Sequence, residues 1–227
     1  MPIVLFDIDM TLVRTNGAGR AAMDAALAEA YGVASPTEGI AFDGRTDRAI
    51  FLDALHRLGD ATPQALQRLV AGYLQRLPGE LERRGGDVLP GVLDLLARLE
   101  HERVPLGLAT GNMRAGAQFK LAHFDLWRRF LGGGFGDHVV VRSELVSAAI
   151  VELSAIAGGP GPQPCVVVGD TPLDIEAAHA AGARAIGVAT GRYTTAELAA
   201  AGADLALPDL SAVDEVITFI HAMANGS

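Results

Sequence analysis

Short apolar runs that alternate with longer helical patterns constrain the fold of this chain more than any other feature. The runs are rich in β-branched residues and lie at 3–6, 104–109, 139–141, 165–168 and 185–188. Strands that are apolar on both faces are typical of parallel sheets buried between two layers of helices. The alternation therefore predicts an α/β fold with a doubly wound, Rossmann-like parallel sheet.

Residues 15–86 interrupt this alternation with three helical patterns and no convincing strand. The third pattern begins at Thr62-Pro63, a good N-cap followed by proline at the first helical position. Connections between sheet strands usually have 2–6 residues or a single helix, so a segment of this length indicates an inserted subdomain. We expect an α/β core formed by 1–14 and 87–227 and an all-helical cap formed by 15–86, with hinges near 14–16 and 84–87.

The composition excludes several classes of partner and compartment. The 227 residues have a net charge of −9, which argues against binding to nucleic acid or to an anionic membrane. No stretch approaches the length of a membrane span, and we expect no secretory leader. The single cysteine, Cys165, excludes an internal disulfide framework and favours a reducing compartment, so we expect a cytoplasmic protein. The sequence leaves the oligomeric state open.

Polar side chains follow four of the predicted strands. Ligands of open α/β sheets bind at the carboxyl ends of the strands, so these positions are the candidate site. Asp7 and Asp9 are two residues apart and point the same way if the chain stays extended. The residues that follow the runs are Asp7, Asp9 and Thr11, then Thr110, Gly111 and Asn112, then Arg142, and finally Asp170 and Asp174.

These residue types predict a magnesium site beside a phosphate site. Two close carboxylates repel each other, and Mg²⁺ prefers one or two carboxylates together with phosphate oxygens. Asp170 can supply a carboxylate from a neighbouring strand. The helix that begins near Met113 offers free amides to a phosphoryl group, and the guanidinium of Arg142 can hold the same group.

The motifs resemble those of the haloacid dehalogenase superfamily, in order and in strand context. Asp7-x-Asp9-x-Thr11-Leu12 is similar to the first motif, Thr110-Gly111-Asn112 to the second, and Gly169-Asp170-Thr171-Pro172-x-Asp174 to the fourth. A helical insert directly after the first motif resembles the cap of the phosphoglycolate phosphatase-like branch. The resemblance therefore covers essentially the whole chain.

The resemblance implies a role for each matched residue. Asp7 would be the nucleophile that forms an aspartyl-phosphate, and Asp9 the general acid and then the general base. Asp7, Asp170 and the backbone carbonyl of Asp9 would bind Mg²⁺, and Thr110 would bind the phosphoryl group. Thr11, Gly111, Asn112 and Asp174 would support them.

Two positions depart from the family pattern. Met10 stands where the family usually has glycine, which removes no catalytic group. The third motif is usually lysine, and we assign it here to Arg142, with Lys120 as the second choice. Lys120 lies in the middle of a predicted helix, where a surface role is expected.

Simpler structural roles remain open for many of these residues. Asp7 and Asp9 can end a strand, Thr110 can cap a helix, and Asp174 can complement a helix dipole. In the predicted cap, Arg45 and Thr46 are candidate substrate contacts because the family's cap loops face the active site, although Thr46 can also be an N-cap.

The sequence thus predicts a Mg²⁺-dependent phosphatase that acts on a small phosphorylated metabolite, such as phosphoglycolate or a sugar phosphate. A phosphomutase similar to β-phosphoglucomutase would use the same residues and differ in whether water or a sugar hydroxyl accepts the phosphoryl group. A non-catalytic binding protein that kept the scaffold is the third hypothesis. The presence of Asp7, Asp9 and Asp170 argues against it.

Overall fold

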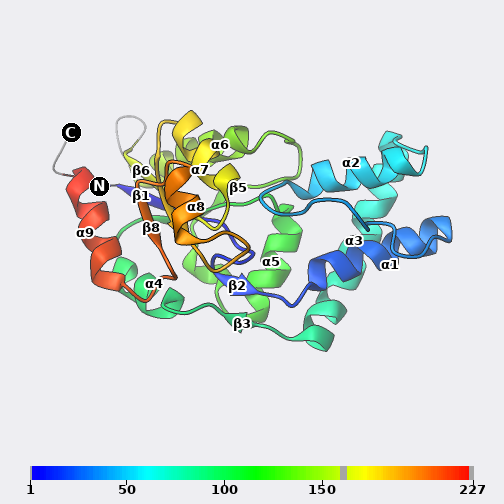
Figure 1. Ribbon diagram of the computed structural model, residues 1–227, viewed down its shortest axis with the longest axis horizontal. Coiled ribbons are helices and arrows are strands. Elements are labelled where there is room, and N and C mark those ends of the chain that lie inside the picture. The colour runs from blue at the N-terminus through cyan, green and yellow to red at the C-terminus, as the bar shows by residue number, and fades with distance from the viewer. Residues whose placement is uncertain (1, 159–162, 225–227) are drawn as a thin grey trace.

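A parallel β-sheet forms the centre of the computed structural model, which describes residues 2–158 and 163–224. Within these residues six strands lie side by side in the order β5-β4-β1-β6-β7-β8 (Figure 1). Their bounds are β1 Ile3–Phe6, β4 Leu106–Ala109, β5 Gly133–Gly134, β6 Cys165–Gly169, β7 Arg184–Val188 and β8 Leu205–Leu207. All the pairings are parallel, which confirms the predicted doubly wound α/β fold.

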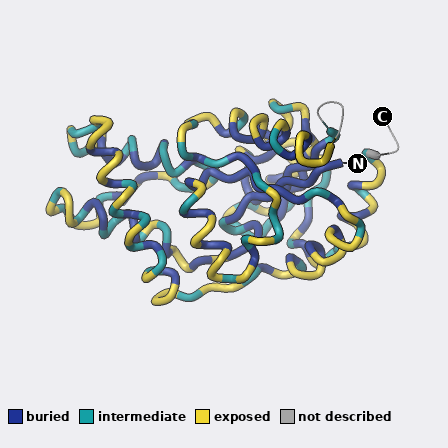
Figure 2. The backbone as a smooth tube through the Cα atoms, turned by 180° about the vertical axis from the view of Figure 1, so that it is seen from behind, coloured by how far each residue is buried: buried dark blue, intermediate teal, exposed yellow. Residues whose placement is uncertain are grey.

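Helices cover both faces of the sheet. Val4 and Phe6 of β1 belong to one apolar cluster, whereas Ile3 and Leu5 belong to the other, as the alternation of side chains along a strand requires. The first cluster includes α4 Val92–His101, α5 Arg114–His123 and α9 Val213–Ala224, and the second α6 Arg142–Ile156, α7 Pro172–Ala180 and α8 Thr195–Ala200. Figure 2 shows the sheet as the most continuously buried part of the backbone. The short 3₁₀ helix Trp127–Arg129 follows α5.

The predicted strand at 139–141 is wrong, and the glycine run before it forms the edge strand instead. Val140 and Val141 are about half exposed and lie in the segment that leads into α6. Gly133 pairs with Leu108, and a Cβ at Gly133 would lie 2.1 Å from the Leu108 carbonyl oxygen. This strand can therefore form only because glycine has no side chain, and a search for apolar runs does not detect such a strand. The sequence analysis also missed β8.

Three helices form a separate lobe beside the sheet, which we call the helical lobe. They are α1 Ala18–Tyr31, α2 Asp47–Arg57 and α3 Pro63–Arg84, and they enclose their own apolar cluster (Figure 1). The hydroxyl of Thr62 accepts a hydrogen bond from the Ala65 amide and Pro63 occupies the first turn, as the sequence predicts. No helix of the described residues combines the length and the apolar character needed to cross a bilayer.

The two segments that connect the lobe to the sheet pair with each other. β2 Val13–Arg14 and β3 Asp87–Val88 form a short antiparallel ladder, and the Arg14 guanidinium contacts the Asp87 carboxylate at 2.8 Å. Entry to and exit from the lobe therefore lie at one place.

Candidate active site

Three neighbouring strands bring the predicted site residues to one edge of the sheet. β1 lies between β4 and β6, so Asp7, Thr110 and Asp170, which follow these strands, are neighbours. Oxygen atoms of Asp7, Asp170 and Asp174 lie within 4.8 Å of one another, and all three residues are buried. The structure thus brings together acidic residues that are distant in the sequence.

Arg142 joins two of these carboxylates. Its Nη2 lies 3.0 Å from Oδ1 of Asp7 and 2.5 Å from Oδ1 of Asp174, and the residue is 8% exposed. Burial lowers the pKa of the guanidinium, but the carboxylates of Asp174 and Asp7 raise it above its usual value. Arg142 therefore stays charged. It contacts Asp7, but the strand at 139–141 that was predicted to precede it does not form, and its third-motif role stays a prediction.

Three buried carboxyl groups, those of Asp7, Asp170 and Asp174, lie near a single guanidinium, that of Arg142. Burial, with further contributions from Asp174 and Asp7, raises the pKa of Asp170 to about 9. Burial also raises the pKa of Asp7 to about 6, although Arg142 and a hydrogen bond with Thr110 oppose the rise. A buried cluster of this kind fits a divalent cation, because a second positive charge would stabilise the ionised carboxylates.

Asp174 has a structural partner as well as an electrostatic one. Its Oδ2 accepts hydrogen bonds from the amide and the hydroxyl of Thr171, at 3.0 and 2.6 Å, and the Thr171 hydroxyl accepts from the Asp174 amide. This reciprocal capping box fixes the start of α7. The other oxygen, Oδ1, faces Arg142, which agrees with a supporting position for Asp174.

Asp9 is held by the second motif and by a lysine. Its Oδ2 accepts hydrogen bonds from Asn112 Nδ2 at 2.8 Å and from Lys120 Nζ at 2.6 Å. Asn112 Nδ2 also donates to the hydroxyl of Thr110 at 2.9 Å. The expected surface role of Lys120 is wrong: the residue is 4% exposed and its ammonium lies in the site.

The turn after β1 adopts the conformation that the family's glycine favours. Met10 has φ 59°, in the left-handed region that glycine enters without steric cost. The Met10 amide donates to the Val13 carbonyl, and the Thr190 hydroxyl donates to the Met10 carbonyl, so bonds on both sides hold the strained residue. Thr11 is buried beside this turn, and its hydroxyl has no hydrogen-bond partner among the described residues.

A loop of the helical lobe lies directly on the second motif. The Asp47 amide donates to the Gly111 carbonyl at 2.7 Å, and the Asp47 carboxylate accepts from the Met113 amide at 2.9 Å. A Cβ at Gly111 would lie 2.2 Å from the carbonyl oxygen of Arg45, so only glycine permits this approach. Arg142 adds a third link, from Nη1 to the Gly44 carbonyl at 3.0 Å.

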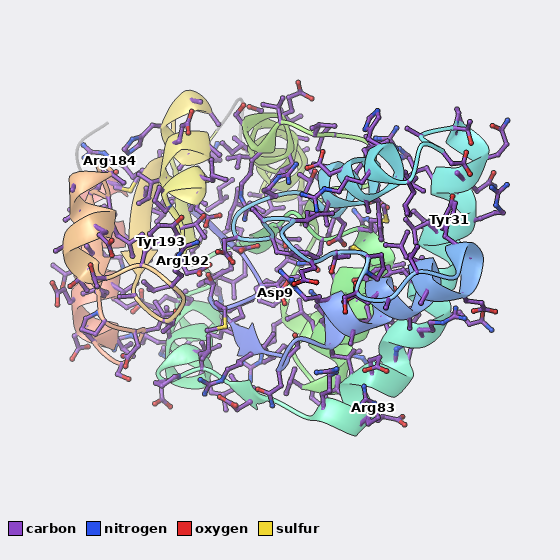
Figure 3. All side chains as sticks on the ribbon, turned by 45° about the vertical axis from the view of Figure 1, so that its right-hand side comes forward. Asp9, Tyr31, Arg83, Arg184, Arg192 and Tyr193 are labelled. Atoms are coloured by element: carbon purple, nitrogen blue, oxygen red, sulfur yellow. The ribbon has the colours of Figure 1, made fainter. Side chains whose placement is uncertain are left out.

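The lobe and the sheet edge enclose a cavity of about 410 Å³. Asp7, Asp9, Asp170, Arg142 and Lys120 line it from the sheet side, and Arg20, Phe42 and Arg45 line it from the lobe. Figure 3 shows Asp9 at the middle of the molecule, between the sheet region that carries Arg184 and the lobe that carries Tyr31. A molecule that fills this cavity therefore contacts both the sheet edge and the lobe.

The two predicted cap contacts differ in position. Arg45 lines the cavity, where its Nη1 contacts Asp53 Oδ2 at 2.7 Å. Thr46 is the N-cap of α2, because its hydroxyl accepts from the Ala49 amide, and it is not among the cavity-lining residues that the structure describes.

Lys120 and Asp47 are the site residues whose positions the sequence analysis missed. A signal for Lys120 is present in α5, where Gly116, Ala117, Lys120 and Leu121 form one buried face. A lysine on an apolar helix face indicates a buried partner. Asp47 carries no comparable signal, because its partner Met113 is distant in the sequence and an acid at a helix start is common.

Comparison with known proteins agrees with this geometry. The sequence pattern of the haloacid dehalogenase-like hydrolases matches residues 4–179. A probable phosphatase of Dickeya dadantii (strain 3937), IndB, is 32% identical over 98% of this chain and 94% of its own. A phosphoglycolate phosphatase of Escherichia coli (strain K12) is 29% identical over 91% of this chain and 86% of its own.

Solved structures show the same fold. A predicted phosphoglycolate phosphatase from Haemophilus somnus 129pt covers 96% of this chain and 98% of its own, with a TM-score of 0.71 and 19% identity. A candidate β-phosphoglucomutase from Thermotoga maritima covers 96% and 99%, with a TM-score of 0.64 and 24% identity. The chain belongs to the haloacid dehalogenase-like hydrolases. Family membership, together with phosphatase relatives that match it over nearly their whole length, makes it an enzyme, a phosphatase of this family.

Proposed function

We propose that this enzyme is a Mg²⁺-dependent phosphatase that hydrolyses a small phosphomonoester through an aspartyl-phosphate on Asp7. The observation that supports this most strongly is the placement of Asp7 and Asp9 in one cavity, each in contact with its own cation. A nucleophilic carboxylate beside a second carboxylate allows one difficult displacement to proceed as two easier ones.

In the first step, an oxygen of Asp7 attacks phosphorus and the bond from phosphorus to the leaving oxygen breaks. Asp9 donates a proton to that leaving oxygen. In the second step, Asp9 takes a proton from water, whose oxygen attacks phosphorus and releases inorganic phosphate and the Asp7 carboxylate. The hydroxyl of Thr110 and the amides that follow it would orient the phosphoryl oxygens, and Arg142 would balance their charge.

The carboxylates of Asp7 and Asp170, with the backbone carbonyl of Asp9, would hold the Mg²⁺. The bound ion would supply positive charge to the phosphoryl oxygens and to the acid cluster. The raised pKa of Asp170, about 9, supports this assignment, because such a carboxyl ionises at neutral pH only with a compensating cation.

The cavity supports a small substrate. Its volume of about 410 Å³ suits a metabolite, and the lobe adds two cations, Arg20 and Arg45, to its wall. We propose phosphoglycolate or a sugar phosphate as the substrate and residues 15–86 as the cap that encloses it. Relatives named phosphoglycolate phosphatase favour the first of these. We also propose a cytoplasmic location, where the buried Cys165 would remain reduced.

The experiment is phosphate release from a panel of esters by purified enzyme with Mg²⁺. The panel includes phosphoglycolate, sugar monophosphates and nucleotides. We expect turnover of at least one small ester and a loss of about 10³-fold or more in Asp7→Asn, because the amide is not a nucleophile. Asp214→Asn, which changes an exposed carboxylate in α9, is the matched control. No release from any ester, or undiminished release by Asp7→Asn, contradicts the proposal.

The same panel distinguishes the mutase hypothesis. A mutase would need a bisphosphate activator and would yield an isomerised sugar phosphate instead of inorganic phosphate. Product analysis by ³¹P NMR separates the two outcomes.

A further inference from the structure

Lys120 is the one lysine among the 18 basic residues of the chain, and it is buried in the active site. The other basic residues are arginines, several of which form exposed ion pairs. An ammonium is a compact point charge, whereas a guanidinium is a broad planar fork. A chain that otherwise uses arginine thus has its one lysine at this buried position, where the ammonium donates to Asp9 and Asn112.

The helical lobe lies directly against Lys120. A Cβ at Gly19, in α1 of the helical lobe, would lie 3.4 Å from Nζ of Lys120 and 3.9 Å from the hydroxyl oxygen of Tyr73. These are ordinary van der Waals distances, so α1 packs directly against the ammonium. Burial lowers the pKa of Lys120, but the charges of Asp9 and Asp47 raise it above its usual value, so the group remains an ammonium.

The hydrogen bonds of Lys120 define the orientation of Asp9. Nζ donates to Asp9 Oδ2 and to Asn112 Oδ1, each at 2.6 Å, and Asn112 Nδ2 donates to the same Asp9 oxygen at 2.8 Å. The hydrogen bonds that Asp9 accepts from Lys120 and Asn112 therefore both end on Oδ2. Among the described residues, no hydrogen bond ends on Oδ1 of Asp9. With Oδ2 fixed from two sides, Oδ1 is the oxygen left to meet a substrate in the cavity that Asp9 lines.

We propose that Lys120 is a positioning residue for Asp9, which it holds with Oδ1 toward the leaving oxygen of the substrate. This inference rests on the proposed phosphatase function. It divides the charge balance of the first motif between two residues: Arg142 serves the nucleophile Asp7, and Lys120 serves the proton donor Asp9. The two cations are therefore not alternatives for one role.

The proposal predicts an effect that depends on the leaving group. Proton donation by Asp9 matters greatly for an alkoxide leaving group and little for 4-nitrophenolate, which leaves without protonation. In Lys120→Met only the hydrogen bond from Asn112 remains on Asp9, so the Asp9 carboxylate can rotate. Nucleophilic attack by Asp7 does not use Lys120, so aryl esters are expected to keep their rate.

The test compares kcat/KM for phosphoglycolate, ethyl phosphate and 4-nitrophenyl phosphate, all with Mg²⁺ at one pH. This parameter covers the reaction through departure of the leaving group, so hydrolysis of the phosphoenzyme does not enter it. For Lys120→Met we expect a loss of about 30-fold or more on the two alkyl esters and less than about 3-fold on the aryl ester. Asp9→Asn should show the same pattern with a larger loss.

Two further variants make the comparison complete. Asn112→Ser removes the other donor to Oδ2 and also a donor to the Thr110 hydroxyl, so it should slow both classes of ester, and alkyl esters more, which tests the proposal if Lys120→Met does not fold. Arg68→Met removes an exposed cation of the helical lobe outside the cavity and should change neither class of ester.

A spectroscopic measurement tests the contact without catalysis. Protein in which the lysine Nζ is labelled with ¹⁵N has one labelled side-chain ammonium, so its spectrum contains one signal, and burial should slow its proton exchange. We expect Asp9→Asn to shift this signal strongly. An unshifted signal, or equal losses on alkyl and aryl esters, overturns the inference. Wild-type protein that cleaves no ester overturns the phosphatase function instead, while the labelling result still reports on the contact.

Discussion

The two walls of the cavity are built in different ways. On the sheet wall, the side chains of Asp7, Arg142 and Lys120 are each less than 10% exposed and make charged contacts at 2.5–3.0 Å. On the lobe wall, the Arg45 side chain is 28% exposed and pairs with Asp53, while Arg20 lies 4.0 Å above the Phe42 ring without a carboxylate partner among the described residues.

This difference separates two tasks. Buried charges with several partners keep one geometry, which suits groups that act on the reacting phosphorus. Cations that are at least partly exposed and have no more than one carboxylate partner can adjust to the rest of a substrate at small energetic cost. We therefore expect substitutions on the sheet wall to lower kcat and substitutions on the lobe wall to raise KM.

Arg142→Met should give the largest effect of the variants considered for this comparison. It removes the cation between Asp7 and Asp174 and leaves both carboxylates buried. We expect kcat to fall about 10²- to 10³-fold, since the phosphoryl charge also loses its partner. Without metal, the free energy of unfolding should decrease by about 3 kcal/mol. Steady-state kinetics and urea unfolding measure the two effects.

Arg129→Met is the control for Arg142→Met, because Arg129 forms an ion pair with Glu100 outside the cavity. It should leave kcat unchanged. If Arg142→Met changed KM alone, the division of tasks between the walls would be wrong.

Metal binding should depend on pH through the same sheet wall. The pKa values of about 9 for Asp170 and about 6 for Asp7 mean that, without metal, Asp170 is protonated at pH 7. Mg²⁺ needs the ionised carboxylate, so its binding should release a proton, and affinity should rise up to about tenfold per pH unit below pH 9. Titration calorimetry in buffers of different ionisation enthalpy measures the released proton.

Asp170→Asn is the informative variant for this pH dependence. It should weaken Mg²⁺ binding, and the Mg²⁺ that still binds should no longer release the proton that Asp170 carries in the wild type. Binding of Mg²⁺ to the wild type at pH 7 with no proton release would argue against Asp170 as a ligand.

The sequence was sufficient for Asp7, Thr110 and Asp170 of the sheet wall, because each follows a strand that is visible as a local pattern, but it was not sufficient for Lys120. The apolar runs that end at Phe6, Ala109 and Val168 each predict a buried strand. The polar residue after each run then lies at the edge of the sheet where the strands have their carboxyl ends. The strand order that places β4 and β6 on either side of β1 comes from the structure. The strand prediction was wrong where an apolar run is compatible with more than one structure. Three consecutive valines at 139–141 resemble a strand, but the glycines before them form the strand that pairs with β4.

Contacts between distant segments could not be predicted in the same way. The mid-helix position of Lys120 gives no information on α1, whose Gly19 covers the ammonium from a segment about one hundred residues earlier. Asp47 is similar, because its amide and carboxylate meet Gly111 and Met113 only after the lobe docks on the sheet. Propensity and periodicity describe each element, but not which elements meet.

The contact between the lobe and the sheet can be tested at Asp47, which hydrogen-bonds to Gly111 and Met113. Burial raises its pKa to about 6, against the opposing effects of Lys120 and the Met113 amide. Because burial disfavours the charged form, the protonated carboxyl group of Asp47 contributes stability that is fully present below its unfolded pKa of 3.8 and is lost as pH rises through 6. Asp47→Asn keeps an acceptor for Met113 without the charge.

The free energy of unfolding of the wild type, relative to Asp47→Asn, should therefore fall by about 1.4 kcal/mol between pH 5 and pH 7.5. Urea unfolding of both proteins at the two pH values measures this. The exposed substitution Asp214→Asn makes the same change in formal charge and should show no such trend. A difference that grows in the opposite direction would mean that Asp47 is stabilised as the anion.

Arg45→Gln should give the smallest effect and should appear in KM. Arg45 lines the cavity from the lobe, but Asp53 already neutralises part of its charge at 2.7 Å. A partly exposed cation of this kind contributes about 1 kcal/mol to binding an anionic substrate, so KM should rise about fivefold while kcat changes less than about twofold. Arg57→Gln is the control, because Arg57 lies in the same lobe, outside the cavity, and donates to the carbonyls of Glu38 and Gly39. A fall in kcat without a change in KM would place Arg45 with the reacting groups, and the lobe wall would then share the chemistry of the sheet wall.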